Sequence, residues 1–223
     1  MTEESVEENK GEKMLIWSAV LLIATVFAIV IFIRISQRPT VKTIDEIMRD
    51  TLTGKETANN FVYNGYAFAK IDNMWWTRWK SGNKAYNIPL RFNPRQVENV
   101  TIDGELDKRF TANNLYITFN PDEERFTYLA LAAGELSLNL VTALNATPIA
   151  ACITNSTDTC STRPIVSCQN EDKAVIYIRE ANETAVLLNG NCMVVQGNGM
   201  EIMRAVDRVL FIWYGIMPRN TGS

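Results

Sequence analysis

The longest hydrophobic pattern in this 223-residue chain is an uncharged run near its N-terminus. Residues 14–33 read MLIWSAVLLIATVFAIVIFI, which leaves no polar face on a helix. At about 1.5 Å of rise per residue, such a run spans about 30 Å, the thickness of the hydrocarbon core of a bilayer. Backbone amides cannot bond to water there, so a spanning segment must be helical. The pattern therefore predicts a transmembrane helix over residues 14–35, with residues 14–33 in the lipid bilayer.

The segments on either side of this helix are polar. A cleaved signal peptide has an apolar region of only about 7–15 residues, followed by small residues at the cleavage site. Neither property is found here, which favours an uncleaved signal anchor. Residues 1–13 are rich in glutamate and typical of a disordered tail, whereas residues 36–60 form a predicted linker. Within the linker, Thr43 and Glu46 match a capping box and predict a short amphipathic helix.

Strand patterns begin directly after the linker. Three segments rich in aromatic and β-branched residues are separated by polar turn residues, at 61–71, 74–80 and 84–92. Pro89 places the third strand at a sheet edge, because proline cannot donate a hydrogen bond to the ladder. Residues 93–113 contain the turn signals Asn93-Pro94 and Asp103-Gly104 and are expected to be irregular.

The second half of the domain mixes long helical patterns with short strands. A strand, a helix and a second strand favour a right-handed crossover over 115–119, 120–144 and 149–153. Three more strands are predicted at 174–179, 184–188 and 192–196. Asn189-Gly190 is the hairpin turn signal between the last two, and a helix with one apolar face follows over 200–214. Residues 61–223 are therefore predicted to form one α+β domain, a mostly antiparallel sheet packed by two longer helices.

Two sets of residues bear on the side of the membrane that holds the domain. The cysteines are even in number and suggest two disulfides of unknown pairing, drawn from Cys152, Cys160, Cys168 and Cys192. Four glycosylation sequons occur, at Asn99, Asn145, Asn155 and Asn182. Both sets favour a domain outside the cytoplasm. The basic residues favour the opposite orientation, since Lys10 and Lys13 precede the helix and Arg34, Arg38 and Lys42 follow it.

Composition excludes several classes of function. The formal net charge is −3 at neutral pH, so the chain lacks the basic surface that nucleic-acid binding requires. Histidine is absent, which excludes Ser-His and Cys-His nucleophilic pairs and histidine-containing zinc sites. The cysteines lack the paired C-x-x-C spacing of structural zinc sites. We therefore expect no metal site, no cofactor and no nucleic-acid partner.

A candidate binding surface lies on the strand predicted over residues 74–80. Side chains alternate between the two faces of a strand, so Trp76, Arg78 and Lys80 share one face. An indole ring beside two cations could bind sugar rings or lipid headgroups. The alternative is a structural tryptophan packed by the stems of its cationic neighbours. The opposite face of this strand is expected to be core.

Two further hypotheses concern catalysis and filament assembly. Glu135 lies on the apolar helix, and a buried carboxylate could act as an acid in an envelope enzyme. No second carboxylate, histidine or nucleophile is near it in sequence, which favours a structural acid. Lys10-Gly11-Glu12 before the apolar run resembles the processing site of type IV pilin precursors. Many pilins carry glutamate at the fifth position after the cut, where this chain has Ile16.

Several stretches of the domain resemble uncharacterised single-pass membrane proteins of small-genome archaea. They are ELSLNL at 135–140, AACITN at 150–155, RPIVSC at 163–168 and AVDR at 205–208. The resemblance implies an anchored extracytoplasmic domain and carries no activity, ligand or catalytic residue with it. The sequence thus favours a non-enzymatic binding module or an accessory subunit of a cell-envelope complex, with an envelope protein or glycan as partner. A pilin-like filament subunit and a carboxylate-dependent envelope enzyme are the alternatives.

Overall fold

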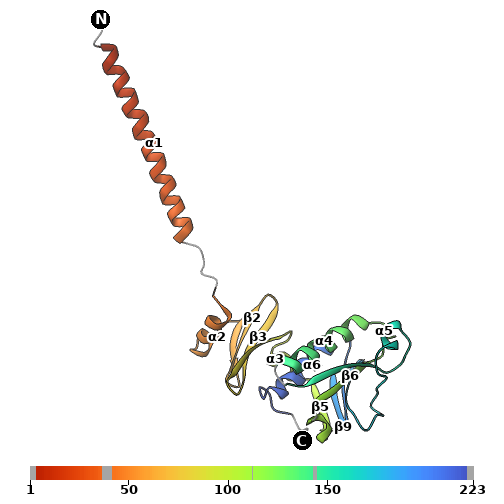
Figure 1. Ribbon diagram of the computed structural model, residues 1–223. Helices are drawn as coiled ribbons and strands as arrows, with labels where there is room; N and C mark the ends of the chain where they lie inside the picture. The colour runs from red at the N-terminus through yellow and green to blue at the C-terminus, as the bar shows by residue number, and fades with distance from the viewer. Residues whose placement is uncertain (1–3, 37–41, 112, 143–144, 220–223) are drawn as a thin grey trace. The chain divides into compact units, whose positions relative to one another are not determined.

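The chain folds as two separate units, Met1–Lys42 and Thr43–Ser223. The computed structural model describes residues 4–36, 42–111, 113–142 and 145–219. Figure 1 shows the helices and strands of both units, and the labels that it carries are those used below. The second unit begins at Thr43, so the segment predicted to be a linker up to residue 60 contributes structure to the folded domain.

The first unit consists of the long helix α1 (Glu4–Ser36), as Figure 1 shows. Its segment Lys13–Ser36 is long and apolar enough to cross a membrane, and none of it is buried. The predicted apolar helix is therefore confirmed. Residues 4–13 continue this helix, although the sequence predicted a disordered tail there. Glutamate and lysine are good helix formers, and extending an existing helix requires no new nucleus.

The second unit starts with a helix and a four-stranded antiparallel sheet, called sheet A. Helix α2 (Ile44–Leu52) precedes strands β1 (Asn60–Tyr63), β2 (Tyr66–Ile71), β3 (Met74–Ser81) and β4 (Lys84–Leu90). The strands pair in chain order, which confirms the edge position of Pro89 in β4. The predicted first strand is in fact a hairpin. Asn64 and Gly65 form its turn, with φ of 48° and 82° as type I′ turns require.

The remaining strands form a six-stranded mixed sheet, called sheet B, in the order β5-β9-β10-β8-β6-β7. Their bounds are β5 Thr101–Leu106, β6 Asn114–Phe119, β7 Thr147–Cys152, β8 Ala174–Glu180, β9 Ala185–Gly190 and β10 Cys192–Gly197. The helical elements between and after them are α3 Pro94–Val97, η1 Lys108–Thr111, α4 Phe126–Thr142, α5 Asp158–Ser161 and α6 Glu201–Trp213. The α+β class is confirmed. Sheet B, however, is mostly parallel: only β9 and β10 pair antiparallel.

Strand β5 lies where the sequence predicted irregular structure. The Asp103-Gly104 pair was interpreted as a turn, but both residues lie inside β5, which pairs in parallel with β9. Gly104 has a φ of 86°, and a Cβ atom there would lie 2.0 Å from the carbonyl oxygen of Leu188. Glycine at this position therefore allows two neighbouring backbones to approach, a role that a turn signal conceals.

Each face of sheet B has a different cover. Helices α4 and α6 pack on one face around a large core, whose fully buried members include Leu129, Leu136, Ile176, Ile202 and Leu210. The other face carries a smaller cluster of Ala151, Val166, Val175 and Cys192, which includes the segment between β7 and β8. The core of sheet A joins the larger cluster, since Phe68 contacts Phe211 of α6 edge to face at 5.8 Å. One continuous core thus connects both sheets.

Candidate functional site

Helix α2 forms one wall of the candidate site, and its first turn is fixed by a complete capping box. The backbone N–H of Thr43 donates to Glu46 Oε2 at 2.9 Å, and the N–H of Glu46 donates to Thr43 Oγ1 at 3.3 Å. Its buried residues are Met48 and Thr51, and the helix contacts β1 and β2. Leu52 lies one turn after Met48 on the same side of the helix but is 58% exposed, so the end of α2 remains accessible.

Strand β3 supplies the second wall through its alternating side chains. Trp75 and Thr77 are buried in the core, and the Trp79 indole N–H donates to the carbonyl oxygen of Tyr214 at 2.9 Å. Arg78 and Lys80 point to the other face and are exposed. This alternation places the three predicted binding residues, Trp76, Arg78 and Lys80, on the side of sheet A that carries α2.

The two walls enclose a groove with a volume of about 710 Å³, hereafter called the α2 groove. Its lining residues come from α2, from the turn before β2, from the start of β2 and from β3: Asp45, Met48, Arg49, Leu52, Gly65, Tyr66, Ala67, Arg78 and Lys80. Trp76, the third predicted residue, is half-buried and does not line the groove. The structure thus brings Arg78 and Lys80 together with Arg49, which the sequence analysis did not identify. The signal for Arg49 was its position one turn after Asp45 on an amphipathic helix.

The charges in the α2 groove are unbalanced in favour of cations. Arg78 forms an ion pair with Asp45, and its Nε donates to Asn87 Oδ1 at 3.3 Å. Arg49 and Lys80 form no side-chain hydrogen bond or ion pair with any residue that the structure describes. Three cations and one carboxylate leave a formal charge of +2 in the groove, although the whole chain has a charge of −3. The groove can therefore bind an anionic group through donors that no internal acid occupies.

The four cysteines form two disulfides, as predicted, and the structure supplies their pairing. Cys152 pairs with Cys160, and Cys168 pairs with Cys192. The first disulfide joins the end of β7 to α5, and the second joins the segment before β8 to the start of β10. Both pairs therefore tie the long connection between β7 and β8 to the sheet. Among the described residues, one helix is long and apolar enough to cross a membrane, and this helix together with the two disulfides fits a membrane-anchored extracellular domain.

The four sequon asparagines are all exposed and lie in loops or turns between the helices and strands. They are Asn99, Asn145, Asn155 and Asn182. Asn99 Oδ1 accepts a hydrogen bond from Arg204 at 2.6 Å, whereas Asn145 has a left-handed φ of 53°. Accessibility is necessary for glycosylation, so modification of these positions stays a prediction.

Glu135 belongs to a buried polar network that is separate from the α2 groove. It forms an ion pair with Arg91, whose backbone N–H donates to Asp207 Oδ2 at 3.0 Å, and the N–H of Phe92 donates to the same oxygen at 2.7 Å. Burial raises the pKa of Asp207 well above its usual value, Glu135 raises it further, and both N–H donors oppose this rise. Burial also raises the pKa of Glu135, against the effect of Arg91. The network joins the turn after β4 to α4 and α6, and neither carboxylate lines the α2 groove.

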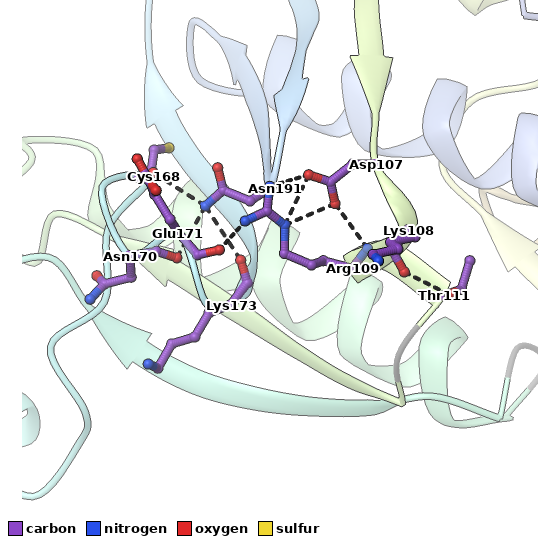
Figure 2. A network of polar contacts seen from close by, with 9 residues as sticks. All are labelled: Asp107, Lys108, Arg109, Thr111, Cys168, Asn170, Glu171, Lys173 and Asn191. Atoms are coloured by element: carbon purple, nitrogen blue, oxygen red, sulfur yellow. Dashed lines mark hydrogen bonds and ion pairs between the residues drawn. The ribbon is translucent and has the colours of Figure 1, made fainter.

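A second polar network fixes the hairpin between β9 and β10, and Figure 2 shows its side chains. The Asn191 side-chain amide points at three backbone carbonyl groups, those of Cys168 at 3.3 Å, Asn170 at 3.1 Å and Lys173 at 3.4 Å. Arg109 pairs with Asp107 and also donates to the carbonyl oxygen of Glu171. The Arg109 guanidinium lowers the pKa of the Asp107 carboxyl to about 2. The donors and acceptors of this network pair with one another, and they hold the loop at residues 168–173 beside the second disulfide.

The described residues of this domain contain no cluster of side chains suited to binding a metal ion. No group of three or more histidine, cysteine, aspartate or glutamate side chains within residues 4–36, 42–111, 113–142 and 145–219 could hold a metal ion. The α2 groove, with its surplus of cations, would repel one.

Comparison with known proteins gives no indication of function. Neither a protein-family model, nor a curated protein, nor a solved structure matches this chain. Function must therefore be inferred from the groove, the anchor and the disulfides.

Proposed function

We propose that this protein is a non-enzymatic, membrane-anchored binding module of the cell envelope that holds an anionic lipid headgroup in its α2 groove. One observation carries the proposal: three cations converge on the groove, and two of them, Arg49 and Lys80, have no internal partner among the described residues. A phosphate group offers several acceptor oxygens to such donors, and arginine binds it with two parallel N–H bonds.

The apolar part of the α2 groove also suits a lipid. Met48, Leu52 and Ala67 lie beside the cations, so an amphipathic ligand could place its headgroup on the basic side and apolar atoms on the other. Only residues 37–43 separate the last residue of α1 from the first residue of α2. A binding site this close in sequence to the anchor helix favours the lipid over a ligand from a distant layer of the envelope.

The test uses the full chain in detergent micelles and native mass spectrometry. Short-chain phosphatidylglycerol is the anionic probe, and short-chain phosphatidylcholine is its zwitterionic control. The double variant Arg49→Gln/Lys80→Gln removes both unpaired cations without breaking the ion pair between Arg78 and Asp45. At about 1 kcal/mol for each basic residue near an anionic lipid, the variant should bind about thirty-fold more weakly.

A matched control variant is Lys108→Gln, which removes one cation from η1, outside the groove. It should bind the anionic lipid as the wild type does. Equal binding of both lipids, or equal binding by the wild type and the double variant, would refute the proposal. If the wild type bound an acidic glycan and not the anionic lipid, the protein would still be a binding module, but the proposed lipid ligand would be wrong.

A further inference from the structure

A second cavity lies at the carboxyl end of β6, where the chain leaves sheet B and begins α4. It has a volume of about 220 Å³ and is lined by Phe119, Pro121, Phe126, Thr157, Thr159, Cys160 and Arg163. Strands β6 and β7 are parallel, and α4 connects them. In sheets of parallel strands, ligands bind outside the carboxyl ends of the strands, where the connecting helices begin. We call this space the β6 cavity.

Two polar groups in the wall of the β6 cavity have no partner among the residues that the structure describes. Thr157 Oγ1 is buried and makes no hydrogen bond. Thr157 stands at the N-cap position of α5, yet its side chain does not cap that helix. Arg163 is half-buried, and its guanidinium forms no hydrogen bond or ion pair. A buried hydroxyl without a partner destabilises the folded protein, and a ligand that forms a hydrogen bond with it would recover that free energy.

The opposite wall of the β6 cavity is aromatic. Phe119 and Phe126 meet edge to face, with ring centroids 5.6 Å apart and ring planes at 73°. Phe126 is 41% exposed, so part of its ring is available to a ligand. The carbon–hydrogen face of a sugar ring packs well on such a surface, while hydroxyl groups bond to polar residues on the other side.

The disulfide Cys152–Cys160 holds the two walls of the cavity together. Phe119 ends β6, whereas Thr157, Thr159 and Arg163 belong to the connection that follows β7. Cys160 itself lines the cavity, and its bond to Cys152 attaches this connection to the end of β7. The cavity therefore depends on a structural element that forms in an oxidising compartment.

From these features we infer that the β6 cavity binds a single carboxylate-bearing sugar ring, such as a uronic acid residue of an envelope glycan. The Arg163 guanidinium pairs with the carboxylate, the two threonine hydroxyls bond to ring hydroxyls, and the phenylalanine rings cover the apolar face. The volume is below the range of about 300–1,000 Å³ that larger ligands need, which limits the site to one ring. This site is separate from the α2 groove and does not rest on the function proposed for it.

The test is calorimetric titration of the full chain in detergent micelles with glucuronate, and with glucose as the uncharged control. The protein should come from a host that adds no N-linked glycans, because Thr157 also completes the sequon of Asn155. We expect glucuronate to bind at least ten-fold more tightly than glucose. Arg163→Gln should remove this preference, and Thr157→Val, which keeps the side-chain shape, should weaken glucuronate binding several-fold.

Two controls separate recognition from unfolding. Lys84→Gln removes an exposed cation from β4 of sheet A and should bind glucuronate as the wild type does. Each variant should also keep the circular dichroism spectrum and melting temperature of the wild type. Absence of glucuronate binding at millimolar concentration, or unchanged binding by Arg163→Gln, would overturn the inference. Inorganic phosphate binding as tightly as glucuronate would also overturn it, because the site would then recognise charge and not a sugar.

Discussion

The two disulfides should stabilise the domain to different extents, because they close loops of different length. Cys152 and Cys160 are 8 residues apart in sequence, and Cys168 and Cys192 are 24 residues apart. In the chain-entropy model, a cross-link removes more freedom from the unfolded chain as its loop grows. These separations correspond to about 2.6 kcal/mol for the shorter loop and about 3.5 kcal/mol for the longer one.

The perturbation is replacement of one pair at a time by alanine, as Cys152→Ala/Cys160→Ala and Cys168→Ala/Cys192→Ala. Alanine is preferred to serine because Cys152, Cys160 and Cys192 are almost fully buried, and a serine hydroxyl there would lack a partner. Each double variant also loses two sulfur atoms from the interior. The difference of about 1 kcal/mol between the two variants is therefore the part that follows loop length.

The assay is urea unfolding of the full chain in detergent micelles, followed by tryptophan fluorescence. Four of the five tryptophans lie in the second unit, so the signal reports on the domain. Both variants should unfold at lower urea concentration, and Cys168→Ala/Cys192→Ala should have the lower midpoint of the two. A larger loss for the Cys152–Cys160 pair, or a loss below about 1 kcal/mol for both pairs, would refute the loop-closure reasoning.

Two other changes test the packing described above. Gly104→Ala should destabilise the domain by more than about 2 kcal/mol in the same assay, because its Cβ would lie 2.0 Å from the Leu188 carbonyl oxygen; a loss near zero would contradict that close approach. Burial raises the pKa of Asp207 in the folded domain, so ionisation of this carboxyl favours the unfolded chain. The contribution of Asp207 to stability is therefore greatest below the pKa of the unfolded state, and it falls as the pH rises towards the pKa of the folded state. Urea unfolding at pH 4 and pH 8 should therefore show that the stability of Asp207→Asn relative to wild type increases with pH, whereas a constant difference would contradict the assignment.

The parts of the fold that could be predicted are those set by local sequence. The apolar run determines α1, and Thr43 with Glu46 determines the start of α2, because both depend on residues within a few positions of each other. The final helix is similar, since its apolar face is visible in the sequence between residues 200 and 214. The last hairpin was predicted one residue early: Asn189 pairs with Cys192, which leaves Gly190 and Asn191 as the turn.

The parts that could not be predicted depend on contacts between distant segments. Strand β5 contains Gly104, which is required by the close approach of the Leu188 backbone, about 80 residues later in the chain. Local turn rules therefore predicted a loop where the structure has a strand. Parallel pairing in sheet B requires long connections that no local pattern specifies. The Asn64-Gly65 turn, by contrast, was a local signal inside a segment that was read as one long strand.

The candidate site shows the same division. Alternation along β3 predicted that Arg78 and Lys80 share a face with Trp76, and it predicted that the opposite face is core. Arg49 reaches the same groove only because α2 packs on sheet A, which is a tertiary contact. Disulfide pairing was likewise open in the sequence, because four cysteines allow three arrangements.

Thiol counting on intact cells tests most directly whether this is a membrane-anchored domain outside the cytoplasm. A membrane-impermeant maleimide is applied before and after treatment with a membrane-impermeant reductant and denaturant, with a cytoplasmic thiol protein as the control for lysis. The chain has four cysteines, and the structure places all of them in disulfides. Labelling of four thiols only after reduction, while the cytoplasmic control stays unlabelled, is the predicted result. Four free thiols that react only after the cells are lysed would place the domain in the cytoplasm and contradict the account.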